Sequence, residues 1–263
     1  MSEISFNTVL TTLLISNLLF SLSCLLFSNS NSILAVGYKT VLFILLLSVL
    51  RLLLPIDFTF TTNILMKGLP SEISSFIRTP RTASLGIHFS IWNILLLIWG
   101  CGTLIQAFLY FRQYKKIHAI IFTAGKDVTL DKKYNQILAS VQAAYGIHQH
   151  FTLVELPFLS SPMLFSIRRP CILLPAQNNY CETDLTYIFR HELAHFKHHD
   201  LLYKLFFQLV FIIYWWNPLK YLLQKQLNSL LEINVDSNLT KDPSDLIPYM
   251  ECLVNVKKQS ITS

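Results

Sequence analysis

A long stretch without any charged residue, from Ile4 to Tyr38, places the strongest limit on how this chain can fold. Within it, the apolar run from Phe6 to Phe27 is long enough to cross a hydrocarbon core of roughly 30 Å as a single helix. Hydrophobic residues make up 52% of the 263 residues and charged residues only 14%, which is too apolar for an ordinary soluble domain of this size. The residues before the run include no Lys or Arg, so the run does not resemble a signal peptide. These features predict a membrane protein.

Two further apolar runs complete the predicted membrane region, residues 1–112. The expected transmembrane helices are about 6–27, 38–54 and 85–111. An irregular external loop is expected between the second and third helices. The basic residues that directly follow the third run are Arg112, Lys115 and Lys116. Since basic residues favour the cytoplasmic side, we expect the N-terminus outside the cell and the chain after position 112 in the cytoplasm.

The remaining residues, 113–263, are expected to form an α+β domain. Apolar residues repeat at helical spacing from Tyr134 to Ala144, an alternating strand pattern begins at Phe151, and a short apolar strand runs from Cys171 to Leu174. The net charge of +6 comes from scattered basic residues without a groove-reading motif, so direct binding of nucleic acid is not expected. The five cysteines lack a C-x-x-C spacing, which argues against a disulfide framework and against a thiolate zinc site.

The segment His191-Glu192-Leu193-Ala194-His195 matches the pattern H-E-x-x-H. On a helix, residues four apart project from one face, so both imidazoles can bind one zinc ion while Glu192 takes a proton from water as general base. The alternative interpretation is a polar helix surface that is rich in histidine. The pattern suggests a hydrolytic site with one Zn²⁺ per chain but does not decide for it alone.

A catalytic zinc site needs a third protein ligand and an open position for water. A third histidine six residues after His195 is excluded, because position 201 is Leu. Glu232 and Asp236 form a further pair four residues apart, so a second helix could present Glu232 to zinc and Asp236 to the outer face of a ligand histidine. The alternative is that both carboxylates lie on a solvated helix face.

The segment between these two helices decides whether they can meet. Residues 201–223 are apolar enough for a fourth transmembrane helix, which would place Glu232 across the membrane from His191. However, Pro218, in the sequence Trp-Trp-Asn-Pro, is poorly tolerated inside a helix and restricts the residue before it. We therefore expect a helical hairpin at about 201–232 that associates with the cytoplasmic leaflet, with a fourth span as the alternative.

Several motifs together resemble the BlaR/MecR-type family of integral-membrane zinc metallopeptidases. The matching segments are Arg51–Pro55, Ser161-Pro162, Arg169–Pro175, His191–Asp200, Trp216–Leu219, and Glu232 with Asp236. They follow the family's order and cover most of the chain from about 40 to 240, which makes the combination far more specific than any single motif. The antibiotic-sensing members also carry a penicillin-binding sensor domain. These 263 residues contain no S-x-x-K followed by S-D-N and K-T-G, so β-lactam sensing by this chain alone is not expected.

The resemblance implies a gluzincin-like domain facing the cytoplasm, in which Glu192 is the general base. The implied zinc ligands are His191, His195 and Glu232. The groups implied to orient the ligand histidines are Asp200 and Asp236. The strand implied to pair at its edge with a substrate backbone comprises Cys171, Ile172, Leu173 and Leu174. The donor that stabilises the oxyanion stays open among His198, His199 and Tyr203.

The favoured function is that of a membrane-embedded zinc endopeptidase in a bacterial cell membrane. We expect it to act in signal transduction by cleaving a cytoplasmic or membrane-proximal protein, such as a transcriptional repressor or the peptidase itself. Its expected partners are a protein or peptide substrate and the lipid bilayer, and its oligomeric state is left open. The main alternative is a non-catalytic signalling or scaffold protein with a structural zinc site. A small transporter is the second alternative, and the few polar residues in the expected spans argue against it.

Overall fold

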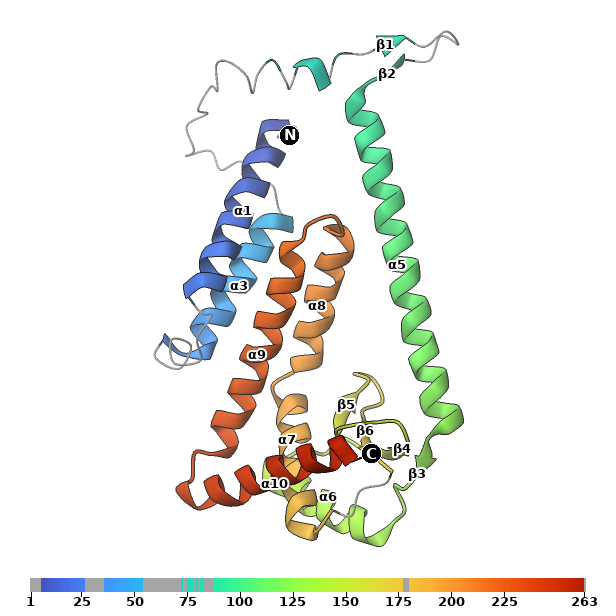
Figure 1. Ribbon diagram of the computed structural model, residues 1–263, viewed down its shortest axis with the longest axis vertical. Coiled ribbons are helices and arrows are strands. Elements are labelled where there is room, and N and C mark those ends of the chain that lie inside the picture. The colour runs from blue at the N-terminus through green and yellow to red at the C-terminus, as the bar shows by residue number, and fades with distance from the viewer. Residues whose placement is uncertain are drawn as a thin grey trace. The chain divides into compact units, whose positions relative to one another are not determined.

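The computed structural model of this protein describes residues 6–26, 36–53, 72, 75–77, 79, 81–82, 88–176 and 180–262. Helices dominate, and a small mixed sheet lies in the second half of the chain (Figure 1). Contacts divide the chain into two compact units, Met1–Tyr110 with Gln208–Gln226, and Phe111–Phe207 with Leu227–Ser263. The expected α+β class is therefore observed, with helix as the main component.

The first unit contains two short apolar helices, α1 (Phe6–Leu26) and α3 (Tyr38–Leu53), which pack side by side (Figure 1). The buried side chains of these helices include Ser16 and Phe20 from α1, and Val41, Leu45 and Val49 from α3. The apolar stretches of these helices, Thr12–Leu22 and Tyr38–Leu50, are shorter than a full membrane span. Two short strands, β1 (Arg81–Thr82) and β2 (His88–Phe89), pair with each other. Most of the expected external loop and the side chain of Arg51 lie outside the described residues.

Among the described residues, α5 (Ile91–Ala124) is the one helix long and apolar enough to cross a membrane. It covers most of the third expected span, 85–111, as one apolar helix, but continues beyond the expected end at position 111. The charged and polar residues after that position are good helix formers, so the end of the apolar run does not end the helix. Three membrane crossings stay a prediction, because only α5 has the required length and hydropathy in the described part of the chain.

The break expected at Pro218 separates α8 (Asp200–Ile213) from α9 (Leu219–Leu239). Asn217 caps α9, because its side-chain oxygen accepts a hydrogen bond from the backbone N–H of Leu219 at 3.0 Å. Its amide also donates to Asn17 of α1 at 2.7 Å. The position of proline directly after this cap agrees with its preference for the first turn of a helix. The sequence therefore located the turn correctly.

In the second unit, four strands form a mixed sheet in the order β3-β4-β6-β5. The strands are β3 (Lys126–Asp127), β4 (Thr152–Leu156), β5 (Met163–Phe165) and β6 (Cys171–Pro175). β6 runs parallel to β4 and antiparallel to β5, and all five of its residues are buried. The expectation that Cys171–Leu174 is an edge strand is wrong, because β5 covers its second side. The edge position on this side of the sheet belongs to β5.

Three helices, α6 (Lys132–Tyr145), α7 (Glu182–Lys197) and α10 (Pro243–Thr262), complete this unit. The apolar core joins the sheet to these helices through fully buried side chains, which include Leu153, Ile172, Leu185, Phe189 and Leu193. Because these α7 residues recur four positions apart, one face of α7 is fixed in the core. The histidines of the H-E-x-x-H motif project from the remaining face.

A bidentate ion pair holds α10 against α7. Arg190 donates from Nη1 and Nη2 to the two carboxylate oxygens of Asp245, at 2.9 and 2.8 Å, and the hydroxyl of Tyr187 donates to the same carboxylate at 2.8 Å. The hydrogen bonds from Arg190 lower the pKa of Asp245 below its usual value. Bidentate pairs of an arginine with a carboxylate fix the relative orientation of the two side chains and also strengthen their interaction.

Replacing Asp245 by Asn should lower the free energy of unfolding at pH 7 by about 1 kcal/mol, a figure that allows for the partial solvent exposure of the pair. Because the folded-state pKa of Asp245 is depressed, the stabilisation is complete above the unfolded-state pKa and is lost as the pH falls through the folded-state pKa. Thermal unfolding in detergent at pH 7 and pH 3 measures this difference. The exposed Glu251→Gln on α10 is the matched control, and an Asp245→Asn effect of equal size at both pH values would contradict the prediction.

Candidate metal centre

The two histidines of the motif lie one turn apart on α7 and converge. Their Nε2 atoms are 3.1 Å apart, and both side chains are mostly shielded from solvent, with 18% of His191 and 10% of His195 exposed. Cys181 caps the N-terminus of α7, because its sulfur accepts a hydrogen bond from the backbone N–H of Asp184. The apolar face of α7 and this cap fix the helix, so the two imidazoles form one edge of a site.

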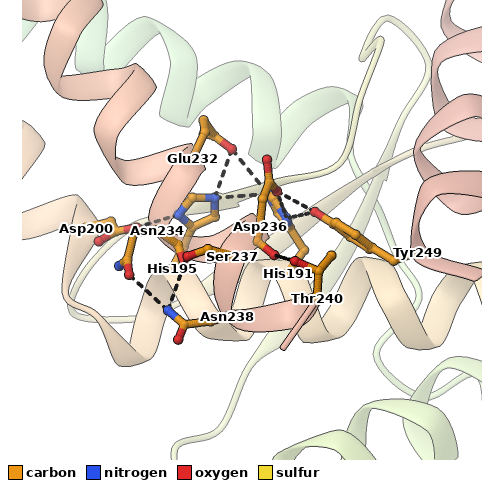
Figure 2. Close-up of polar contacts among 10 residues, drawn as sticks. All are labelled: His191, His195, Asp200, Glu232, Asn234, Asp236, Ser237, Asn238, Thr240 and Tyr249. Carbon is orange, nitrogen blue, oxygen red and sulfur yellow. Dashed lines mark hydrogen bonds and ion pairs between the residues drawn. The ribbon is translucent and has the colours of Figure 1, made fainter. Parts of the chain in front are cut away.

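The third expected ligand, Glu232, comes from α9 and completes the cluster. Its Oε2 lies 3.4 Å from Nε2 of His191 and 3.6 Å from Nε2 of His195 (Figure 2). A tetrahedral zinc site with bonds of about 2.0–2.1 Å has ligand atoms about 3.4 Å apart, so the three observed distances fit such an ion. Because Glu232 reaches the histidines, the chain turns back between α8 and α9, and a straight fourth span is excluded.

The outer nitrogens of both histidines are engaged, which leaves the Nε2 atoms for a metal. Nδ1 of His195 lies 2.6 Å from Oδ2 of Asp200, a carboxylate that is only 1% exposed. Nδ1 of His191 lies 2.9 Å from the hydroxyl of Tyr249, which donates at 2.5 Å to Oδ1 of Asp236 (Figure 2). Metal-binding histidines almost always donate from their other nitrogen in this way. The structure therefore places Asp200 and Asp236 beside the site, with Tyr249 as an unexpected member.

The electrostatics of the site match a cationic occupant. Burial lowers the pKa of His195, but hydrogen bonds to Asp200 and Glu232 outweigh burial and raise it to about 9. Burial raises the pKa of Glu232, but hydrogen bonds from His191 and His195 outweigh this effect and hold the pKa of the carboxyl well below its usual range. An ionised Glu232 thus attracts positive charge to the two imidazoles. His195 would have to give up this proton to bind zinc through Nε2, because a metal ligand must be a neutral imidazole.

Glu192 occupies the position expected for a general base. Its side chain is 6% exposed and lines the same cavity as the three ligand residues. Burial raises the pKa of its carboxyl, and the nearby histidines and a hydrogen bond from the backbone N–H of Leu164 oppose that rise. A raised carboxyl pKa moves this group toward the range in which it can both accept and return a proton near neutral pH.

The cluster opens into a cavity of about 340 Å³. One wall comes from edge strand β5 and the segment before it, through Ser161, Pro162, Met163 and Leu164. Another wall comes from α10, through Tyr249, Cys252, Leu253 and Val256. No residue of the predicted substrate strand Cys171–Leu174 is among the described residues that line the cavity. This absence follows from the central place of β6 in the sheet.

None of the three candidates for the oxyanion donor lines this cavity in the described part of the chain. The candidates were His198, His199 and Tyr203. Nδ1 of His198 lies 3.0 Å from the side-chain amide of Asn234 instead. Lys204 does line the cavity and carries the cationic side chain of that wall. It follows Asp200 by one helical turn, a spacing that the sequence contains but that no motif singled out.

Comparison with known protein families gives an independent finding. The family model described as "BlaR1 peptidase M56" matches residues 43–262. The chain belongs to this family. The matched region includes α7, α9 and α10, and so all the residues of the metal cluster. The M56 family is a family of zinc peptidases, and the cluster of His191, His195 and Glu232 fits its H-E-x-x-H-plus-Glu site.

Individual M56 relatives are distant and longer than this chain. The "Methicillin resistance mecR1 protein" of Staphylococcus aureus is 26% identical over 201 residues, which cover 70% of this chain and 34% of the relative. The same protein of Staphylococcus epidermidis matches equally. The "Regulatory protein BlaR1" of Bacillus licheniformis is 29% identical over 154 residues, which cover 58% of this chain and 24% of the relative. The match thus spans about a third or less of each relative.

Proposed function

We propose that this M56 family member is a membrane-embedded zinc endopeptidase. The observation that carries the proposal is the placement of two imidazole Nε2 atoms and one carboxylate oxygen at tetrahedral spacing, directly beside the buried carboxyl of Glu192. Three ligands leave a fourth position for water, which is the mark of a catalytic rather than a structural zinc site. The cavity beside the cluster gives a substrate access to that position.

In peptide-bond hydrolysis, metal binding and proton transfer would be carried out by different residues of the chain. His191, His195 and Glu232 would hold the metal. When bound, zinc supplies a Lewis acid that polarises a carbonyl and makes water a nucleophile near neutral pH. Glu192 accepts the proton of the attacking water and returns it to the leaving amine. The burial of Glu192 limits the access of bulk water to this proton.

Strand β5 is the element best placed to hold a substrate. It is an edge strand of the sheet, and Met163 and Leu164 line the cavity beside the cluster. An extended peptide can add to such an edge through main-chain hydrogen bonds. The role first assigned to Cys171–Leu174 therefore passes to β5. An unfolded or extended segment of a protein is the expected substrate.

The membrane topology and the biological role belong to the same proposal. We assign residues 1–112 to a multi-pass membrane region with the N-terminus outside and residues 113–263 to a cytoplasmic peptidase domain, on the strength of α5 and the basic residues that follow its apolar part. The word "regulatory" in the name of the Bacillus relative supports a role in signal transduction. The substrate would then be a cytoplasmic or membrane-proximal protein, such as a repressor or the peptidase itself.

The alternative is a scaffold in which zinc only ties helices together. Replacing Glu192 by Gln separates the two functions, because Glu192 is not needed as a metal ligand. A peptidase would keep its zinc and lose cleavage. A scaffold would keep both its zinc and its signalling function.

A further inference from the structure

Tyr249 contacts the metal cluster but belongs neither to the H-E-x-x-H pattern nor to the downstream acidic pair. It lies on α10, far in sequence from α7, and its side chain is only 1% exposed. Its ring packs in an apolar cluster with Ala194, Val235 and Leu239 and lies nearly parallel to the ring of His191, at 6.4 Å between centroids. Burying a hydroxyl in such an apolar site costs free energy unless the hydroxyl is hydrogen-bonded.

The hydroxyl of Tyr249 makes two hydrogen bonds that connect Asp236 to His191. Oδ1 of Asp236 lies 3.7 Å from Nδ1 of His191, too far for a direct hydrogen bond, whereas the hydroxyl lies 2.5 Å from that oxygen and 2.9 Å from that nitrogen (Figure 2). A phenol has one proton, and here it is donated to the carboxylate. The hydroxyl can then only accept from His191, so the imidazole must carry its proton on Nδ1.

We propose that Tyr249 is a positioning residue of the metal centre, which relays the hydrogen bond of Asp236 to His191 and so fixes this ligand in the tautomer and orientation that bind zinc. The inference rests on the proposed zinc site. Asp200 serves His195 by a direct contact of 2.6 Å, whereas His191 depends on the two-step contact through Tyr249. The hydroxyl faces Nδ1 and not the metal-binding Nε2, so Tyr249 acts through His191 and not on the substrate.

This relay makes α10 a part of the metal centre. Tyr249 can reach His191 only while α10 is docked on α7, and that docking is held by the ion pair of Arg190 with Asp245. A change that releases α10 would therefore weaken zinc binding without touching any ligand. The C-terminal helix thereby links the fold of the peptidase domain to its metal content.

Zinc affinity of the detergent-purified full chain, measured by competition with a chelating dye, tests the relay. Tyr249→Phe should weaken zinc binding about 10- to 100-fold, the range found for losses of outer hydrogen-bonding partners of metal ligands. Asp236→Ala should weaken it similarly. Because both residues act through one relay, the double variant should bind zinc within about twofold of the weaker single variant, a coupling that general destabilisation would not produce.

Tyr187→Phe is the matched control, since its ring lies 6.0 Å from that of Tyr249 but its hydroxyl contacts Asp245 and no ligand. It should leave zinc affinity unchanged, because the ion pair of Arg190 with Asp245 still holds α10 on α7. The absorption spectrum of the cobalt-loaded chain should change in Tyr249→Phe and not in Tyr187→Phe, because only the first alters a ligand imidazole. Unchanged zinc affinity in Tyr249→Phe, or additive losses in the double variant, would overturn the relay alone. A wild-type chain that binds no zinc would overturn the proposed function as well.

Discussion

Replacing Glu192 by Gln should reduce peptide-bond hydrolysis about 10²- to 10⁴-fold and leave the zinc content unchanged. Glutamine has nearly the same shape as glutamate and can occupy the same buried position beside β5, but it cannot accept a proton from water. Glu192 is not among the three residues whose ligand atoms converge, so the metal should stay. The measurements are cleavage of fluorescently labelled casein, self-cleavage followed on a gel, and zinc content by elemental analysis.

Glu251→Gln is the matched control for this prediction. It makes the same chemical change at an exposed position of α10, and both activity and zinc should be retained. Full cleavage by the Glu192→Gln variant would show that this carboxyl is not the general base. Loss of zinc together with activity would mean that Glu192 supports the metal, and the proposed division of roles would then be wrong.

Replacing Glu232 by Ala should remove most of the bound zinc. Four-ligand zinc sites bind with roughly 10–16 kcal/mol, so one ligand contributes on the order of 3 kcal/mol, or at least about 100-fold in affinity. The loss should be larger than that expected for Tyr249→Phe, because Glu232 contacts the metal itself. Elemental analysis of the purified variant and competition with a chelating dye measure the effect.

The control for Glu232→Ala is Asn228→Ala, an exposed position one turn earlier on the same helix. It should keep its zinc, which shows that truncating a side chain of α9 is tolerated. Zinc retained at wild-type affinity in Glu232→Ala would assign the third ligand elsewhere. Asp236 would then be the nearest carboxylate to His191, at 3.7 Å between Oδ1 and Nδ1.

Much of the metal cluster could be predicted from the sequence because its histidine pair and the turn that follows obey local rules. The spacing of His191 and His195 places them on one face of a helix, and Pro218 marks the turn that lets α9 return. The pairing of Glu232 with the two histidines then follows from the need for a third ligand. The first two inferences depend on neighbours within one or two turns, where sequence patterns are most informative, whereas Glu232 was chosen from the need for a third ligand and from the family resemblance.

The order of strands and the role of Tyr249 could not be predicted in the same way. β5 has only three residues, too few for an alternating pattern, so nothing in the sequence indicated that it would cover β6. The buried, continuous apolar run of Cys171–Leu174 is in fact typical of a central strand. Tyr249 reaches His191 through the docking of two helices, and that contact depends on tertiary packing between segments distant in the chain.

The most direct test of the central claim is to return zinc stepwise to chelator-treated, detergent-purified wild-type chain while cleavage of casein and of the chain itself is recorded. The zinc site described above predicts no cleavage after chelation, a rise in proportion to added zinc, and a plateau at one zinc per chain. Magnesium should not restore activity, because nitrogen ligands do not suit it. Cleavage that persists without zinc, or a fully zinc-loaded chain that cleaves neither substrate, would contradict the assignment of this site as a zinc peptidase centre.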